Sequence, residues 1–279
     1  MQTLGTKAGI MIGSDFSEVA RRYEKSSLLQ SAASEVLFEL LAIQGDEDVL
    51  DVGCGSGKLT RRIRALTSGK VVGIDSSGGM IGEAQRGEGE IPFLREAVEE
   101  LKYSHLFDVI FCNSAFQWFK DHKKALANMH RALRKEGRVG IQAPATSEYC
   151  PNFIRATDAV AADSRTKKTF GSFCSPWLFM EKSEDYATLF EQAGFRTVFT
   201  KIEKRLTRHS PDQVYEFFAS GAIAGYLNPE CYSVPLSDRY TEDFVSIVKR
   251  SFEEQADETG FVDLEFNRIY LVALASAPD

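Results

Sequence analysis

Residues 49–57 read Val-Leu-Asp-Val-Gly-Cys-Gly-Ser-Gly, and this stretch decides the fold of the chain. The apolar segment 48–52 predicts a buried strand, and the segment 58–66 predicts a helix that begins where the loop ends. Alternating glycines allow backbone conformations closed to other residues and let a ligand approach closely. Because the free N–H groups of such a loop face its ligand, the stretch predicts a site for a nucleotide-like molecule.

A second predicted strand limits the expected class of ligand to nucleosides. Residues 70–74 are apolar and end in Asp75, 18 positions after Gly57, near the spacing at which dinucleotide folds place a ribose-binding carboxylate. The loop lacks the G-x-x-x-x-G-K-[ST] pattern, so it has neither the lysine nor the hydroxyl that serve a triphosphate and its magnesium. An ATPase is therefore a poor interpretation.

With these motifs the chain resembles the class I S-adenosylmethionine-dependent methyltransferases, whose first motif is similar to residues 49–57 and whose second is an acid like Asp75. Residues 107–113 resemble the fourth strand of that family, and residues 131–138 resemble its "R-x-L-K-P-G-G" turn. The turn here lacks the proline, and residues 76–80 carry an extra glycine pair. A nicotinamide-dependent dehydrogenase with the same fold remains the alternative.

Composition excludes several classes of partner. The chain has 279 residues, with 33 basic and 40 acidic side chains, a net charge of −7 and a pI near 5.3, so no overall field attracts nucleic acid. Neither a signal-like start nor an apolar run of about 18 residues is present, and we expect a cytoplasmic protein without a membrane partner. The five cysteines and four histidines show no metal-ligand spacing, so no metal is predicted. The sequence leaves the oligomeric state open.

Short apolar segments alternate with helical ones, which predicts a parallel sheet with helices on both faces. The expected strands are 48–52, 70–74, 91–95, 107–113, 138–142, 195–202 and 264–274. The last of these resembles the final antiparallel strand of the family. The predicted fold class is α/β, a Rossmann-like, doubly wound, seven-stranded sheet with its last strand antiparallel and with a helical cap.

The whole chain, 1–279, is expected to form one domain. The expected parts are N-terminal cap helices at 1–45, a cofactor-binding core at 46–145, helical cap insertions at 146–182 and 204–258, and the remainder of the sheet with its helix at 183–203 and 259–279.

Residues at the end of the fourth strand indicate a branch of the family. The pair Gln117-Trp118 resembles the "L-Q-W" signature of carboxyl methyltransferases acting on trans-aconitate, malonyl-acyl carrier protein and juvenile hormone acid. The segment from Tyr23 to Gln30 is similar to the "Y-x-x-x-x-x-x-Q" helix of that group, and residues 265–268 are similar to its "x-F-x-R".

The resemblance implies S-adenosylmethionine as cofactor and a set of site residues. The expected catalytic residues are Gln30, Gln117 and Trp118. The expected cofactor-binding residues are Tyr23, Asp51, Gly53, Cys54, Gly55, Gly57, Asp75, Ser76, Met80, Glu96, Ala97, Asn113, Ser114 and Ala115. Asp51, at the end of a buried strand, needs hydrogen-bonded partners, and we expect the loop amides to supply them and the methionine ammonium to lie near it.

Structural roles compete with some of these assignments. Trp118 could be a core aromatic, Gln30 an exposed helix residue and Glu96 a solvated loop carboxylate. The leading hypothesis is methylation of a carboxylate oxygen on a small organic acid. The alternatives are O-, N- or C-methylation of a neutral metabolite and a non-catalytic sensor of adenosylmethionine or adenosylhomocysteine.

Overall fold

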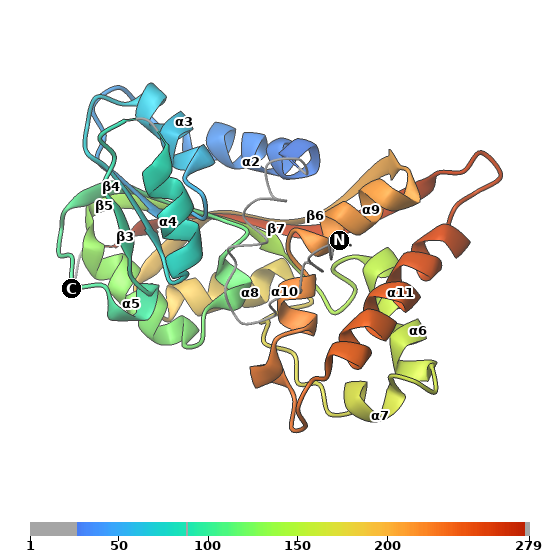
Figure 1. Cartoon of the computed structure of the whole chain (residues 1–279). Coiled ribbons are helices and arrows are strands. Elements are labelled where there is room, and N and C mark those ends of the chain that lie inside the picture. The colour runs from blue at the N-terminus through green and yellow to red at the C-terminus, as the bar shows by residue number, and fades with distance from the viewer. Residues whose placement is uncertain (1–26, 88, 277–279) are drawn as a thin grey trace, which may run out of the picture.

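The computed structural model describes residues 27–87 and 89–276 and is built on one seven-stranded sheet (Figure 1). The strands are β1 (Val49–Val52), β2 (Val71–Asp75), β3 (Phe93–Arg95), β4 (Phe107–Asn113), β5 (Leu133–Pro144), β6 (Phe195–His209) and β7 (Val262–Ala275). The main helices are α2 (Ser27–Leu41), α3 (Lys58–Leu66), α4 (Gly78–Arg86), α5 (His122–Ala132), α6 (Pro151–Ala162), α7 (Lys167–Phe170), α8 (Ser183–Glu191), α9 (Pro211–Ala219), α10 (Ile223–Tyr226) and α11 (Asp238–Glu254).

The strand order is β3-β2-β1-β4-β5-β7-β6, which confirms the predicted fold class. Strands β1 to β5 pair in parallel, whereas β7 runs antiparallel to both β5 and β6. The chain winds outward in both directions from β1 and β4. In open sheets of this kind, ligands bind at the carboxyl ends of the strands where the order reverses.

The turn expected before the fifth strand lies within β5. Leu133 pairs with Phe107 and Arg138 pairs with Val109, so the residues between them bulge out of the ladder. Glu136 lies at the tip of this bulge with a φ of 62°, a conformation that costs a side chain about 1–2 kcal/mol.

Helices cover both faces of the sheet with apolar side chains. On one face α2 and α3 pack with Val49, Val109 and Phe111, and on the other face α5 and α8 pack around Phe116 and Ile141. Leu37, Phe38 and Leu41 of α2 are buried in the first of these layers. This end of α2 is therefore part of the sheet core, and not of an N-terminal cap as expected for 1–45; residues 1–26 lie outside the described part of the chain.

A second apolar cluster forms the cap, built from α6, α9, α10, α11 and the start of β7. The long β6–β7 ribbon extends from the sheet to this cap (Figure 1). Because β6 continues to His209, residues 204–209 belong to the sheet and the second cap segment begins after them. In the first cap segment, Pro151 begins helix α6, where a missing N–H has no intrahelical partner to lose.

In the described ranges 27–87 and 89–276, no helix combines the length and the apolar character that crossing a membrane requires.

Candidate functional site

The glycine loop between β1 and α3 has the left-handed backbone that its glycines predict. Gly53, Gly55 and Gly57 have φ angles of 73°, 55° and 78°. A Cβ on Gly53 would lie 2.2 Å from the Ala115 Cβ, and one on Gly57 would lie 2.6 Å from the Phe93 ring. At Gly55 no atom comes closer than 3.9 Å, because its Cα faces the cavity described below. The loop therefore presents open backbone to a ligand at one position and packs tightly at the other two.

Asp75, at the end of β2, is fastened to the loop by backbone amides. Its Oδ2 accepts from the Gly55 N–H at 3.0 Å and its Oδ1 accepts from the Ser77 N–H at 2.8 Å. Burial raises the pKa of the Asp75 carboxyl, although both of these hydrogen bonds favour the ionised form. The carboxylate both orders the loop and lines the cavity, where a diol would find two acceptor oxygens.

Asp51 lies beneath the loop, and its hydrogen-bond partner differs from the one expected. Its Oδ2 accepts from the Thr60 hydroxyl of α3 at 2.7 Å, whereas the loop amide of Gly55 turns toward Asp75. The side chain is only 2% exposed, and burial, together with a smaller contribution from the charge of Asp75, raises the pKa of Asp51 to about 7. A cation placed near these two carboxylates would lower both pKa values.

A cavity of about 2050 Å³ begins at this loop and extends to the cap. Most of the predicted cofactor residues that the structure describes line it: Gly53, Gly55, Asp75, Ser76, Met80, Glu96, Ala97, Asn113, Ser114 and Ala115. Three others do not line it, namely Asp51, Cys54 and Gly57, because they are packed behind the loop. Asp51 contacts Thr60, and Gly57 packs on the Phe93 ring.

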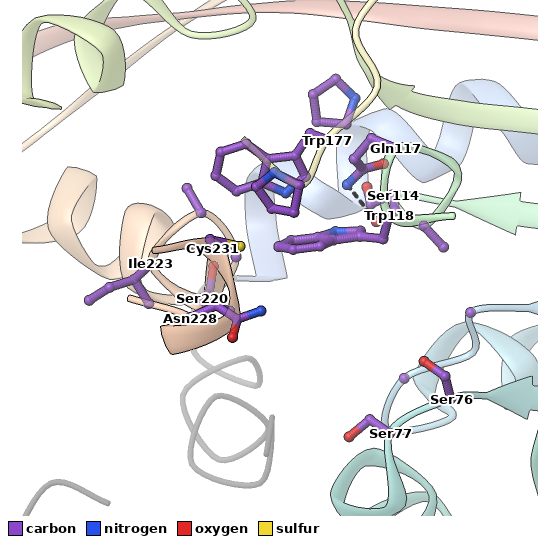
Figure 2. Close-up of a pocket in the computed structure, with 18 of the residues that line it drawn as sticks. Ser76, Ser77, Ser114, Gln117, Trp118, Trp177, Ser220, Ile223, Asn228 and Cys231 are labelled. Carbon is purple, nitrogen blue, oxygen red and sulfur yellow. Dashed lines mark hydrogen bonds between the residues drawn. The ribbon is translucent and has the colours of Figure 1, made fainter. Parts of the chain in front are cut away.

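Figure 2 shows the cavity with the loop side and the cap side facing one another across it. Ser76 and Ser77 lie on one side, and Ser220, Ile223 and Cys231 lie on the other. The indoles of Trp118 and Trp177 meet between them in an edge-to-face contact, with ring centroids 5.3 Å apart. Usual ligand pockets measure roughly 300–1,000 Å³, so this cavity has room for two ligands side by side.

The collar after β4 places Gln117 and Trp118 on the cavity wall. Gln117 is 6% exposed, and its amide Nε2 donates to the Ser114 carbonyl at 3.0 Å. Its Oε1 is buried and has no hydrogen-bond partner among the described residues. In this conformation the amide therefore offers the cavity neither atom freely, because Nε2 is bonded to Ser114 and Oε1 is closed off, whereas the resemblance implies a donor to a substrate carboxylate.

Two predicted residues cannot be placed in the site. Tyr23 lies outside the described residues, and Gln30 is described only as part of helix α2.

Sequence reasoning missed Thr60 and Gln142 as parts of this region, and it indicated Trp177 only as one of the cap aromatics that could line an apolar pocket. Gln142 is fully buried near the end of β5, where its amide donates to Asn113 Oδ1 and Ser114 Oγ, both at 3.0 Å. Its position at the carboxyl end of a parallel strand, next to the switch in strand order, was a usable signal. Trp177 lies in a segment of irregular sequence, and no pattern placed it opposite Trp118.

The residues present fit S-adenosylmethionine. The open Cα face of Gly55 admits close contact, Asp75 offers oxygens to a ribose, and the carboxylates of Asp75 and Glu96 on the cavity wall favour a ligand that carries positive charge.

Comparisons with known proteins agree with this geometry. Residues 50–141 match the family model described as a methyltransferase domain. The chain is 32% identical over 126 residues to a malonyl-[acyl-carrier protein] O-methyltransferase of Calditerrivibrio nitroreducens, an alignment that covers 44% of this chain and 50% of that protein. It is 30% identical over 140 residues to a trans-aconitate 2-methyltransferase of Deinococcus radiodurans, covering 50% and 54%.

The chain thus spans about half the length of these curated relatives. Among solved structures it is similar to a Bacillus halodurans protein described as a methyltransferase, with a TM-score of 0.57, 15% identity, and coverage of 88% of this chain and 100% of that one. At this identity the likeness concerns the fold. Residues 50–141 are thus similar in sequence to methyltransferase domains, and the loop geometry and sheet topology agree with that likeness.

Proposed function

We propose that the protein transfers a methyl group from S-adenosylmethionine to a carboxylate oxygen of a small organic acid. The observation that carries the proposal is the cavity itself, which joins the glycine loop and Asp75 to the collar of Gln117 and Trp118. The cofactor supplies a methyl group bonded to a sulfonium, and the protein has to align the acceptor with it and exclude water.

A carboxylate acceptor suits the groups that line this cavity. Among the described lining residues there is no histidine, the side chain that most often serves as a general base near neutral pH. A carboxylate is already nucleophilic at neutral pH and needs positioning instead of deprotonation. Both curated relatives are named as methyltransferases of acids or acyl groups, which supports the same choice.

One observation favours a second candidate, methylation of a hydroxyl or amine on a neutral metabolite. The unpartnered Gln117 Oε1 is buried in this conformation, and after rotation of the side chain toward the cavity it would accept a hydrogen bond from an O–H or N–H group, which an ionised carboxylate lacks. The pH profile separates the two candidates. A carboxylate acceptor gives a rate that stays flat above its own pKa, near 4 to 5, whereas a rate rising steeply between about pH 6 and 8 would reject it.

The activity test uses labelled S-adenosylmethionine with a panel of organic acids and follows methyl ester formation. We expect Gln117→Ala and Trp118→Phe to lower kcat by roughly 10-fold or more, within the range of a lost positioning or acid–base contact, and to leave adenosylhomocysteine affinity nearly intact. Gln192→Ala, at an exposed position outside the cavity, is the control. Absence of ester from every acid would reject the carboxylate proposal.

A further inference from the structure

Arg268 is the one buried cation among the described residues that line the cavity. It lies on β7 opposite Pro144 of β5, and its side chain is only 6% exposed. The other basic residues on the cavity wall are exposed; they are Arg95, Lys120, Lys124, Lys249 and Arg250. A guanidinium on a cavity wall attracts ligands that carry negative charge, and its planar fork of donors matches a carboxylate.

Neighbouring side chains hold the Arg268 guanidinium in place. Its Nη1 donates to the Gln142 side-chain oxygen at 2.9 Å, and its Cζ lies 4.6 Å from the centre of the Phe266 ring. Through Gln142 this arrangement continues to Asn113 and Ser114 at the end of β4. A guanidinium has five N–H donors in a rigid fork, so Arg268 can serve Gln142 and a carboxylate at once.

The cavity wall beyond Arg268 is aromatic. Phe266 contacts Phe153 with ring centroids 5.4 Å apart, and Phe153 contacts Tyr149 at 6.3 Å. Tyr149 stacks on Phe179 at 4.8 Å, and Phe179 stacks on Trp177 at 6.0 Å. A ligand held by its charge at Arg268 would therefore lie with the rest of its body along apolar rings.

We propose that Arg268 anchors the carboxylate of the acceptor, and that the acceptor is an amphipathic acid whose apolar body packs on the wall of Tyr149, Trp177 and Phe179. The inference rests on the proposed function and names its substrate class. Arg268 acts here as a specificity-determining residue, because it chooses among ligands by charge. The aromatic wall then chooses among acids, favouring those that carry a ring or an alkyl chain.

Binding, measured without turnover, tests this inference separately from methyl transfer. The probes are 3-phenylpropanoate and decanoate, each compared with its primary amide, and succinate as an acid without an apolar body. Calorimetric titrations use the full chain saturated with adenosylhomocysteine. We expect 3-phenylpropanoate or decanoate to bind at least 10-fold more tightly than its amide and than succinate.

Substitution of the guanidinium should remove that preference. Arg268→Gln should weaken acid binding at least 10-fold and leave amide binding unchanged, and Arg268→Lys should keep part of the preference. Arg205→Gln is the matched control, because it removes an exposed cation from the neighbouring strand outside the cavity. It should change neither acid binding nor amide binding. Unchanged adenosylhomocysteine affinity and thermal midpoint show that each variant is folded.

Equal affinity for acid and amide, a preference that survives in Arg268→Gln, or binding of none of the probes would overturn the inference. A result in which acids bind through Arg268 but yield no methyl ester would uphold the anchor and reject the proposed carboxylate methylation.

Discussion

The cofactor half and the cap half of the cavity are built on different principles. The loop side is made of backbone: left-handed glycines and amides that hold Asp75. The cap side is made of side chains, with aromatic rings from α6, α9, α10 and the segment around Trp177 packed on one another. A site made of backbone atoms accepts few ligand shapes, because its geometry hardly depends on the surrounding side chains. A wall made of side chains changes shape whenever one of them is substituted. We infer that the first half sets the cofactor and the second sets the acceptor.

The largest effect should come from a methyl group placed on the loop. In Gly53→Ala the new Cβ would lie 2.2 Å from Ala115, at a φ of 73° that alanine rarely adopts. Backbone strain and overpacking each cost about 1–3 kcal/mol, so we expect a loss of about 2–6 kcal/mol in unfolding free energy, with cofactor binding abolished. Urea unfolding and calorimetry measure both.

Gly82→Ala is the matched control for this substitution. Gly82 lies inside helix α4 and a Cβ there meets nothing within 4 Å. Alanine should stabilise that helix by up to about 1 kcal/mol. If Gly53→Ala were as stable as Gly82→Ala, the loop would not be the rigid half of the cavity.

The loop side should also respond to pH through Asp51. Burial raises its pKa in the folded protein to about 7, above the value of about 3.9 in an unfolded chain. The folded state therefore binds the proton more tightly, and the stability that Asp51 contributes is complete below about pH 4 and is lost as the pH rises toward 7. The difference in unfolding free energy between Asp51→Asn and the parent chain should shift by about 2–4 kcal/mol in favour of the variant as the pH rises from 4 to 8. Urea unfolding at a series of pH values measures it.

Cofactor binding gives an independent view of the same carboxyl group. If the methionine ammonium lies near Asp51, its charge lowers the pKa and binding near pH 6 releases a proton. Calorimetry of adenosylhomocysteine binding in buffers with different ionisation enthalpies counts that proton. No release in the parent chain, or equal release in Asp51→Asn, would separate Asp51 from the ammonium.

Removal of Asp75 should weaken cofactor binding, but by less than the complete loss expected for Gly53→Ala. Asp75→Ala takes away the acceptors for the Gly55 and Ser77 amides and for the ribose, so we expect a loss of about 1.5–3 kcal/mol of binding free energy. Asp158→Ala, at an exposed position outside the cavity, removes the same charge and should leave the affinity unchanged. Calorimetry that showed equal affinities for both variants would contradict the assignment of Asp75.

The positions of the secondary-structure elements could be predicted from sequence better in the cofactor half than in the cap half. Strand β4 and helix α3 occur at the residues expected, because glycines, apolar runs and the spacing to Asp75 are local signals. The same signals could not give the partner of Asp51, since the choice between Thr60 and the loop amides depends on how the loop turns.

The cap carries weaker local signals. Strand β6 was expected to end at 202 and continues to His209, because its outer part is a half-solvated ribbon with charged residues and lacks an apolar run. Helix α6 begins at Pro151, a residue that also marks chain interruptions. Arg268 stands out in sequence as a charge within an apolar strand, yet only the structure places it on the cavity wall.

The smallest effect on folding should come from a methyl group placed in the cap, and it should fall on the acceptor. A Cβ on Gly225 of α10 would lie 2.1 Å from Trp177, so Gly225→Ala has to displace that indole. Because a side chain moves more easily than backbone, we expect a loss of about 1–2 kcal/mol in unfolding free energy. We also expect a rise of roughly 3-fold or more in the KM of a methylated acid, with adenosylhomocysteine affinity within 2-fold of the parent chain. Gly221→Ala is the control, because a Cβ there meets nothing within 4 Å and leaves Trp177 in place. If Gly225→Ala weakened the binding of adenosylhomocysteine as much as that of the acceptor, the two halves of the cavity would act as one site. The inference that one half binds the cofactor and the other the acceptor would then be wrong.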